Sequence, residues 1–388
     1  MGSSASSFSR RSFLQASSMA SAALAMRIVT EPILAYAAAP PHPKGAVLIN
    51  ANENPLGPCA SAREAVAAVT PQGGRYLTES TDELMEVFAK SVGVPHEQLA
   101  IYAGSTPPLI FTVHTFCSPQ ASYVTADPGF EAGMFAAQRA GARVVKVPLT
   151  KTYAHDVKAM LAAAPDAAVF YICQPNNPTG TLTSASDMEY LVEHKPKNSI
   201  VLVDEAYIHF SDASSAIELV KAGKDVIVLR TFSKLYGMAG LRCGFAIGRA
   251  DLLEKVHNYG GFNFMPVTAV AAATASLQEP TLVADRRRLN EQVRSATFAW
   301  LDRNGYSYIP SVSNCFLLET KRPAKEVIAA MAQQNVIIGR VWPAMPTYAR
   351  ITVGTSEEME QFQAAFQKVM KGTSMGALQA PAMPLRRN

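Results

Sequence analysis

The residues best suited to chemistry lie in one stretch, residues 226–247, where a polar turn separates two apolar runs. The turn carries Thr231, Ser233 and Lys234, and Arg242 follows eight residues after the lysine. The apolar runs predict a strand, an exposed turn and a second strand. Hydroxyls and a guanidinium bind phosphate, and a lysine amine forms Schiff bases, so the stretch predicts a site for a phosphorylated carbonyl cofactor anchored on Lys234. A lone lysine in such a turn is more often a solvated loop residue, so the neighbouring motifs must decide.

Two further segments also end in polar residues. Residues 169–180 form an apolar run that stops at an Asn-Pro turn carrying Asn177. Residues 200–210 form another run, which ends at Asp204 and has Tyr207 three residues later. Continuous apolar runs are typical of strands buried on both faces of a parallel sheet, and such sheets bind ligands at the carboxyl ends of their strands. We therefore expect the three segments to form one site.

Three motifs together resemble the fold-type I aminotransferases of class I and II, which depend on pyridoxal 5'-phosphate (PLP): NPTG at 177–180, DEAY at 204–207, and Ser233-Lys234 with Arg242. Four longer segments are similar to histidinol-phosphate aminotransferase within that class: residues 52–58, 204–210, 229–245 and 350–355. The motifs extend from about residue 48 to residue 370, which is nearly all of the expected mature chain. Their order and spacing are together highly specific, whereas any one alone is weak.

The resemblance implies an α/β fold with a large domain, whose mostly parallel seven-stranded sheet is covered by helices, and a smaller α+β domain. Helix and strand patterns alternate up to residue 270, as expected of such a sheet. On this basis we expect the small domain at 41–74 and 271–370, the large PLP-binding domain at 75–270, and a loose tail at 371–388. The resemblance also implies a homodimer with shared active sites.

The resemblance assigns the catalytic roles to Lys234, Asp204 and Tyr207. Asp204 would keep the pyridine nitrogen of PLP protonated, so that the ring can accept electrons when the substrate's α-proton leaves. Tyr207 and Asn177 would bind the phenolic oxygen of the ring. Lys234 would anchor PLP and, once displaced by the substrate amine, carry the proton from Cα to C4′ of the cofactor.

The residues expected to bind the cofactor's phosphate share hydroxyl or guanidinium groups: Ser105, Thr106, Thr231, Ser233 and Arg242. Ser105 and Thr106 lie between a predicted strand and an apolar run that predicts a helix. The free N–H groups at a helix start form a phosphate cradle. A Gly-Ser-Thr turn could alternatively serve only as a helix cap.

Two aromatic residues complete the expected cofactor site. Phe130 occupies the position where the family stacks a ring on the pyridine, which needs only a flat apolar face. Tyr76 matches a tyrosine that reaches the cofactor phosphate of the neighbouring subunit. The alternatives are an ordinary core residue for Phe130 and a surface aromatic for Tyr76.

The substrate site is expected at Arg350, Arg340 and Asn52. Arg350 matches the residue that holds the substrate's α-carboxylate, and its planar fork suits a bidentate contact; a solvated strand arginine is the alternative. Arg340 lies near the family's arginine for the distal phosphate of the substrate. Asn52 opens the NENPLGP motif. A pocket for an aromatic or other amino acid is the alternative, formed by Tyr259, Asn263 and Trp342.

These residues predict a PLP-dependent aminotransferase that moves an amino group between an amino acid, or an amine like histidinol phosphate, and a 2-oxo acid, through a Schiff base on Lys234. One alternative is a PLP-dependent decarboxylase or lyase of the threonine-phosphate decarboxylase type, which would release CO2. Another is a non-catalytic PLP-fold binding or regulatory protein. Retention of Lys234, Asp204 and Arg350 together argues against the last.

Composition supports a folded globular protein. Of 388 residues, 48% are hydrophobic and 17% charged, which is enough for two lobes around a substantial core. The net charge of +4, without a run of basic residues, argues against a nucleic-acid partner. The cysteines and histidines do not show the spacing of a zinc site, so no metal is expected. After the N-terminal region no stretch reaches the roughly 20 apolar residues of a membrane span. The five cysteines form no paired motif, which favours free thiols.

The first 40 residues predict an export signal and a linker. Residues 9–15 match the twin-arginine pattern, and an apolar stretch at 16–26 and a small-residue region at 35–39 follow. Cleavage near Ala37 would place the mature protein in the periplasm or another extracytoplasmic space. The alternative is an N-terminus in which Arg10-Arg11 occurs by chance, and a cytoplasmic protein.

Overall fold

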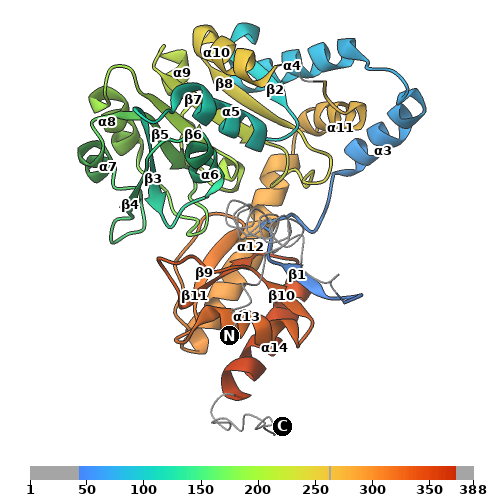
Figure 1. Ribbon diagram of the computed structural model, residues 1–388. Coiled ribbons are helices and arrows are strands. Elements are labelled where there is room, and N and C mark those ends of the chain that lie inside the picture. The colour runs from blue at the N-terminus through green and yellow to red at the C-terminus, as the bar shows by residue number, and fades with distance from the viewer. Residues whose placement is uncertain (1–42, 262–263, 373–388) are drawn as a thin grey trace, which may run out of the picture. The chain divides into compact units, whose positions relative to one another are not determined.

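The computed structural model describes residues 43–261 and 264–372 (Figure 1). The described residues from Ala46 onward belong to one compact unit, so the predicted domain boundaries stay a prediction. The twin-arginine motif, the predicted cleavage region, Asn263 and most of the expected tail at 371–388 lie outside the described residues.

A seven-stranded sheet forms the centre of the fold, as predicted. Its strands, in spatial order, are β2 (Leu99–Tyr102), β8 (Gly244–Gly248), β7 (Val226–Thr231), β6 (Ile200–Asp204), β5 (Ala167–Cys173), β3 (Ser122–Asp127) and β4 (Val144–Pro148). The neighbours from β7 to β4 are parallel, and β8 is antiparallel to both β7 and β2. The polar ends of β5, β6 and β7 therefore meet at the same edge.

Helices flank this sheet: α3 (Ala60–Val69), α4 (Thr78–Val92), α5 (Thr106–Phe116), α6 (Ala132–Arg139), α7 (Val157–Ala163), α8 (Ala185–His194), α9 (Ile217–Lys221), α10 (Ala250–Gly260) and α11 (Val267–Leu277). Three short 3₁₀ turns connect elements at Thr70–Gln72, His96–Gln98 and Ile208–Phe210. The helix predicted after Ser105 is present and begins at Thr106.

Side chains of β6 alternate between two hydrophobic clusters. Ile200 and Leu202 belong to one cluster, whereas Val201 and Val203 belong to the other, as the two-residue repeat of a strand requires. Helices α5, α6 and α10 contribute buried residues to the first cluster, and α4, α7, α8, α9 and α11 contribute to the second. Both faces of the sheet are thus covered, which explains why every residue of β5 and β6 is buried.

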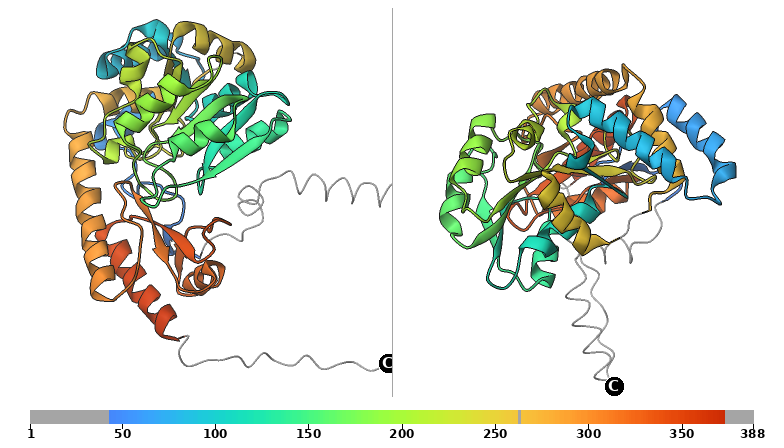
Figure 2. Two further views of the ribbon diagram at one scale, coloured as in Figure 1. Left: turned by 90° about the vertical axis from the view of Figure 1, so that its left-hand side faces the viewer. Right: turned by 90° about the horizontal axis from the view of Figure 1, so that it is seen from above.

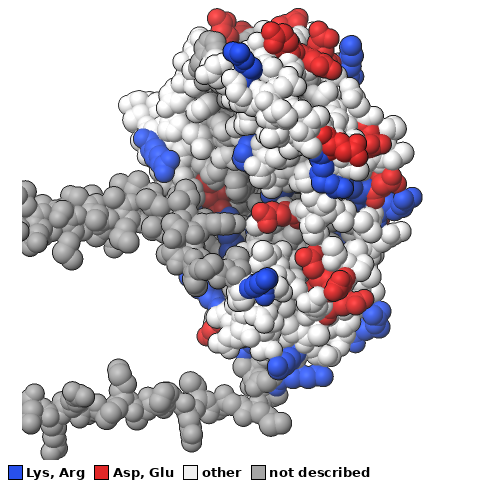
Figure 3. All heavy atoms as spheres, turned by 90° about the vertical axis from the view of Figure 1, so that its right-hand side faces the viewer, with Lys and Arg blue, Asp and Glu red and all other residues white. Residues whose placement is uncertain are grey.

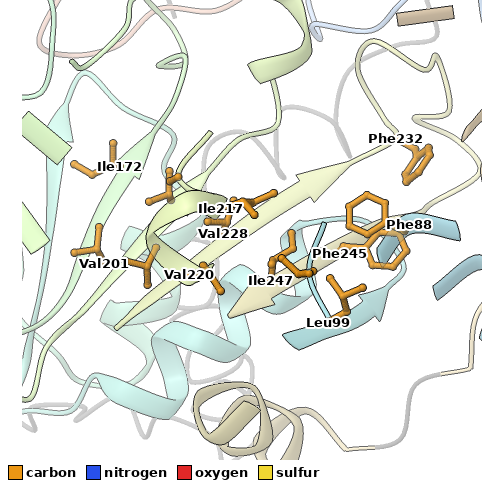
Figure 4. Packing of buried hydrophobic residues seen from close by; sticks show 14 of the residues in the cluster. Phe88, Leu99, Ile172, Val201, Ile217, Val220, Val228, Phe232, Phe245 and Ile247 are labelled. Atoms are coloured by element: carbon orange, nitrogen blue, oxygen red, sulfur yellow. The ribbon is translucent and has the colours of Figure 1, made fainter. Parts of the chain in front are cut away.

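Core packing also anchors the turn that carries Lys234. In the second cluster, Phe88 of α4 stacks on Phe245 of β8, with ring centroids 3.8 Å apart (Figure 4). Phe232, which lies between Thr231 and Ser233, is buried and contacts both rings. The residue directly before Ser233 is therefore fixed in the hydrophobic core.

Two small sheets form a second layer of structure. β1 (Val47–Ile49) pairs in parallel with β10 (Val336–Ile338), and β9 (Cys315–Glu319) pairs antiparallel with β11 (Tyr348–Thr352). They share a hydrophobic cluster with α12 (Leu282–Arg303), α13 (Ala324–Ala332) and α14 (Ser356–Gly372). Figure 2 shows α12 as the long orange helix that extends from the part of the fold with the seven-stranded sheet down alongside the small sheets. The β1–β10 pairing brings Asn50 beside Gly339 and Arg350.

The five cysteines are free thiols, as predicted. Within residues 43–261 and 264–372, no helix is long and apolar enough to cross a membrane. The same residues contain no group of three or more His, Cys, Asp or Glu side chains that could hold a metal ion. On the face drawn in Figure 3, acidic and basic side chains are interspersed.

Candidate active site

The site lies where three parallel strands end. Cys173 at the end of β5 is paired in register with Asp204 at the end of β6, and Asp204 is paired with Leu229 of β7. The chain leaves β7 at Thr231 and enters the turn that carries Lys234. The register of the sheet therefore places the predicted residues of these motifs side by side.

Lys234 is held between the β1 segment and Tyr207. Its Nζ donates a hydrogen bond to the carbonyl of Ala51 at 3.3 Å and lies 5.7 Å from the centroid of the Tyr207 ring. Burial, with the positive charge of Arg350 as a second cause, lowers the pKa of Lys234 from 10.5 to about 8. A considerable fraction of this amine is therefore neutral near pH 8, as a nucleophile or base must be.

Asp204 is a buried carboxylate with few partners. Its Oδ2 accepts a hydrogen bond from the Tyr171 hydroxyl at 3.0 Å, and its Oδ1 accepts one from the Ala206 N–H at 3.1 Å. Burial raises the pKa of Asp204 to about 6, although these hydrogen bonds oppose the shift. None of the ion pairs among the described residues includes Asp204. A protonated ring nitrogen would supply the missing counter-ion, so this carboxylate fits PLP.

Asn52 connects the substrate side to Tyr207. Its Nδ2 donates to the Tyr207 hydroxyl at 3.0 Å and to Cys315 Sγ at 3.1 Å. Asn52 has a left-handed backbone conformation, with φ of 55°. Its N–H donates a hydrogen bond to the Thr352 hydroxyl, which in turn donates to the side-chain oxygen of Asn52. Burial raises the pKa of Tyr207, so its hydroxyl stays protonated and can donate to an oxygen in the site.

A phosphate-binding group of side chains follows β7. Thr231 Oγ1 donates to Ser233 Oγ at 2.9 Å, and Arg242 Nη1 donates to the same Ser233 oxygen at 3.3 Å. Arg242 also binds the carbonyls of Ala239 and Ala103. Its guanidinium lies against Gly104, where a Cβ atom would approach Nη2 to 2.3 Å, so only glycine leaves room for the arginine. The group contains positive charge and hydroxyls but no carboxylate, which suits a phosphate.

Ser105 and Thr106 border the same group. Ser105 precedes α5 and Thr106 begins it, close to Ala103, whose carbonyl binds Arg242. Pro107 and Pro108 follow and have no N–H, so the free backbone donors at this helix start are those of Ser105 and Thr106. Ser105 forms no side-chain cap on its own helix, which leaves its hydroxyl available for a ligand. Gly244 allows the close approach, because a Cβ there would lie 2.8 Å from the Ser105 nitrogen. The structure therefore brings Ser105 close to Gly244 and to the Arg242 region, and the phosphate-binding role of Ser105 and Thr106 stays a prediction.

Arg350 is buried on β11 and faces the same site. Its Nη1 donates to Asn177 Oδ1 at 2.9 Å, and its Nη2 donates to the Asn50 carbonyl at 2.6 Å. Its Nε is buried without a partner among the described residues. Burial lowers the pKa of Arg350 from its ordinary value. An unsatisfied buried donor beside Lys234 is a fitting contact for a substrate carboxylate.

Arg340 lies next to Arg350 but has a different partner. The Arg350 N–H donates to the Arg340 carbonyl at 3.2 Å, so the two backbones are neighbours. The Arg340 guanidinium forms an ion pair with Glu131. Both guanidinium carbons lie over the ring of Trp342, at 4.4 Å for Arg340 and 5.5 Å for Arg350.

The remaining predicted residues are less closely joined to this network. Phe130 is partly buried and packs against the hydrophobic cluster that includes Tyr207. Tyr76 is 70% exposed and stacks on Phe264, with centroids 4.4 Å apart. Tyr259, considered as an alternative pocket residue, stacks instead on His114 of α5.

Two residues of the site were not identified from the sequence. Tyr171 binds Asp204, and its only signal is a phenol inside the otherwise apolar run of β5. Glu131 binds Arg340, but it follows Phe130 in a loop, where an acidic residue is common and gives no sequence signal of a function. Both depend on partners far away in the chain, 33 residues for Tyr171 and 209 for Glu131.

The fold and the site define an α/β enzyme with an activated lysine, a buried carboxylate and a phosphate cradle at the strand ends of one sheet. The model of the family described as aminotransferase class I and II matches residues 44–366. The chain belongs to this family. It is a PLP-dependent aminotransferase with the fold-type I architecture.

Individual relatives are similar over most of their length. A histidinol-phosphate aminotransferase from Moorella thermoacetica is 31% identical over 334 residues, covering 84% of this chain and 86% of the relative. An aromatic amino acid aminotransferase from Cutibacterium acnes is 33% identical over 341 residues, covering 85% and 94%. The crystal structure of histidinol-phosphate aminotransferase from Sinorhizobium meliloti in complex with pyridoxal-5'-phosphate has a TM-score of 0.77 and 25% identity, covering 84% of this chain and 90% of that one.

Proposed function

We propose that this aminotransferase exchanges the amino group of an amino acid with a 2-oxo acid at the site around Lys234. PLP, when bound, withdraws electrons from the substrate's Cα and so allows the α-proton to leave. The observation that carries the proposal is that the charges of Asp204 and Arg350 both act on the amine of Lys234, which lies over the ring of Tyr207. Lys234, Asp204 and Arg350 can respectively move a proton, stabilise a protonated ring nitrogen and hold a carboxylate.

Lys234 serves as cofactor anchor and as proton carrier. Its lowered pKa, about 8, leaves the amine able to accept a proton near neutral pH. The carbonyl of Ala51 orients Nζ from one side. Tyr207, kept protonated by burial, would donate a hydrogen bond to the phenolic oxygen of bound PLP, and Asn52 fixes the position of the Tyr207 hydroxyl.

The phosphate is held by Ser105, Thr106, Thr231, Ser233 and Arg242. Asp204 supports the ring nitrogen, and Phe130 provides an apolar face for the ring. Arg350 binds the substrate's α-carboxylate, because its buried Nε has no other partner among the described residues. The names of the relatives make histidinol phosphate and aromatic amino acids the first donors to test.

The test is a spectral screen. The purified holoenzyme is mixed with single amino donors, and conversion of the bound cofactor's absorption band to that of the pyridoxamine form is followed. We expect conversion with at least one donor and reversal with a 2-oxo acid. Release of CO2 with formation of an amine would instead support the decarboxylase alternative, and the absence of any reaction would support a non-catalytic binding protein.

Lys234→Ala provides the matching variant. We expect turnover to fall by about 10³-fold or more, since general acid–base catalysis and the covalent anchor are both lost. Cofactor bound without a covalent link should still be detectable after gel filtration, which shows that the variant is folded. Undiminished turnover would remove Lys234 from the mechanism.

We further propose a homodimer in which Tyr76 reaches the partner's cofactor phosphate. The exposure of Tyr76 and its stacking on the half-exposed Phe264 support this, because a paired aromatic surface is suited to an interface. Light scattering should report a dimer. Tyr76→Phe should weaken cofactor binding but leave the dimer intact. A monomer with full activity would contradict the proposal.

Export is a separate proposal, supported by the twin-arginine pattern at residues 9–15. We propose that the folded enzyme crosses the membrane by the twin-arginine route into an extracytoplasmic space. Fractionation of cells that express the full chain tests this. Replacement of Arg10 and Arg11 by lysine should retain the protein in the cytoplasm, and an unchanged distribution would contradict export.

A further inference from the structure

The ion pair between Arg340 and Glu131 changes the charge of the substrate half of the site. Arg340 follows β10, and Glu131 lies 209 residues earlier in the chain, just before α6. Glu131 occupies the N-cap position of α6, but its side chain forms no cap hydrogen bond there. Its side chain is instead committed to Arg340.

Trp342 makes this arrangement rigid. Its ring is 2% exposed, and its Nε1 donates to the Gly129 carbonyl at 2.9 Å, two residues before Glu131. The ring therefore joins the segment before α6 to the segment after β10. The guanidinium groups of Arg340 and Arg350 both lie over this ring. Neither arginine can move far without losing that contact.

The charges of these groups do not favour a second anion. Arg340, Glu131 and Arg350 together carry one net positive charge, which the α-carboxylate of an amino acid neutralises. A second carboxylate or a phosphate on the side chain would have to compete with Glu131 for Arg340. Glu131 would then be left as an unpaired charge in a partly buried position, beside another anion. Like charges brought together in this way are strongly disfavoured.

We propose that Glu131 is a specificity residue that selects amino donors with an uncharged side chain and disfavours donors with a distal anion. The proposal rests on the proposed transamination at the Lys234 site and adds the substrate class. Glu131 acts through Arg340, by occupying the guanidinium that would otherwise attract a distal carboxylate or phosphate. It does not take part in the chemical step.

Pairs of donors that differ only in charge test the proposal. Glutamine and asparagine are compared with glutamate and aspartate, and histidinol with histidinol phosphate, in single-turnover conversion of the holoenzyme. We expect the wild type to prefer the uncharged member of each pair by about tenfold in kcat/KM. A preference for the anionic member would overturn the proposal.

Glu131→Gln is the decisive variant, because it keeps the size of the side chain and removes its charge. We expect kcat/KM for the anionic donors to rise about tenfold relative to the uncharged donors. Adding Arg340→Ala to Glu131→Gln should abolish this gain. Glu189→Gln, on the exposed surface of α8, is the matched control and should leave the ratio unchanged. A uniform change for all donors would indicate a merely structural ion pair and overturn the proposal.

A binding experiment separates this proposal from the proposed function. Succinamate and succinate differ only by an amide in place of a carboxylate, and neither can be transaminated. Calorimetry should show tighter binding of succinamate to the wild-type holoenzyme and a reversed order for Glu131→Gln. Failure of every donor to react would contradict the proposed function alone. Equal effects of Glu131→Gln on both ligands would contradict the role of Glu131 alone.

Discussion

In the cofactor half of the site, the functional groups stand on the ends of adjacent strands or on the turn that leaves one of them. In the substrate half, Arg340 follows β10, Arg350 lies on β11, and Glu131 lies directly before α6. The positions of the groups in the cofactor half are set by the hydrogen-bond register of a buried sheet. The substrate half depends on side-chain contacts between distant segments, with Trp342 between them.

This difference suggests how each half tolerates change. Positions on strand ends are fixed by the core, as the packing of Phe232 against Phe88 and Phe245 shows. Substitutions there should affect chemistry and leave the fold intact. In the substrate half, a change in one charged side chain alters the partners of the next. We therefore expect substitutions in the cofactor half to change rates for all substrates, and those in the substrate half to change substrate preference.

After Lys234→Ala, the largest effect in the cofactor half is expected for Asp204→Asn. An amide cannot stabilise a protonated ring nitrogen as a carboxylate does, so kcat should fall by about 10²-fold or more for every donor. Stopped-flow measurement of the half-reaction checks this. Asp225→Asn is the matched control, because Asp225 precedes β7 and pairs with Lys195 and Arg249 rather than with the site. A loss confined to some donors would contradict the separation of the two halves.

The pKa of Lys234 links the two halves, because burial and Arg350 both lower it. In the cofactor-free protein, acylation of Lys234 should increase with pH and reach half of its maximal rate near pH 8, since only the neutral amine reacts. Mass spectrometry of the peptide that contains Lys234 gives this midpoint. Arg350→Gln should raise the midpoint by removing a nearby positive charge. A midpoint near 10.5 in the unaltered protein would show that burial does not lower the pKa.

The two halves also differed in how far the sequence predicted them. The apolar runs ending at Asn177, Asp204 and Thr231 indicated buried parallel strands, and parallel strands necessarily bring their ends together. That rule was enough to group the three motifs into one site, whereas the seven-stranded sheet and the remaining cofactor residues were implied by the resemblance to the class I and II aminotransferases. No such rule connects Glu131 with Arg340, because the contact depends on how the small sheets pack against α6. Tyr171 was missed for a different reason, because its hydroxyl meets Asp204 only when β5 and β6 are in register, and the apolar runs alone do not give that register.

Ser233→Ala is expected to have an intermediate effect. Ser233 Oγ accepts hydrogen bonds from Thr231 and Arg242, and a phosphate would take over this role. Loss of one charge-assisted hydrogen bond should weaken PLP binding by about tenfold, with kcat nearly unchanged at saturating cofactor. Fluorescence titration of the cofactor-free protein measures the affinity. Ser91→Ala on α4, whose hydroxyl binds only the Phe88 carbonyl among the described residues, should leave it unchanged.

The smallest effect is expected for Trp342→Phe in the substrate half. Phenylalanine retains an aromatic face for Arg340 and Arg350 but loses the hydrogen bond from Nε1 to the Gly129 carbonyl. Since the arginines keep their other contacts, KM for amino donors should rise only about threefold, with little change in kcat. Trp300→Phe on α12 is the natural control, because this second tryptophan stacks on Tyr306 within the small-sheet part of the fold. If kcat fell instead while KM stayed constant, Trp342 would influence the chemical step. That result would contradict the expectation that the substrate half affects only substrate binding and preference.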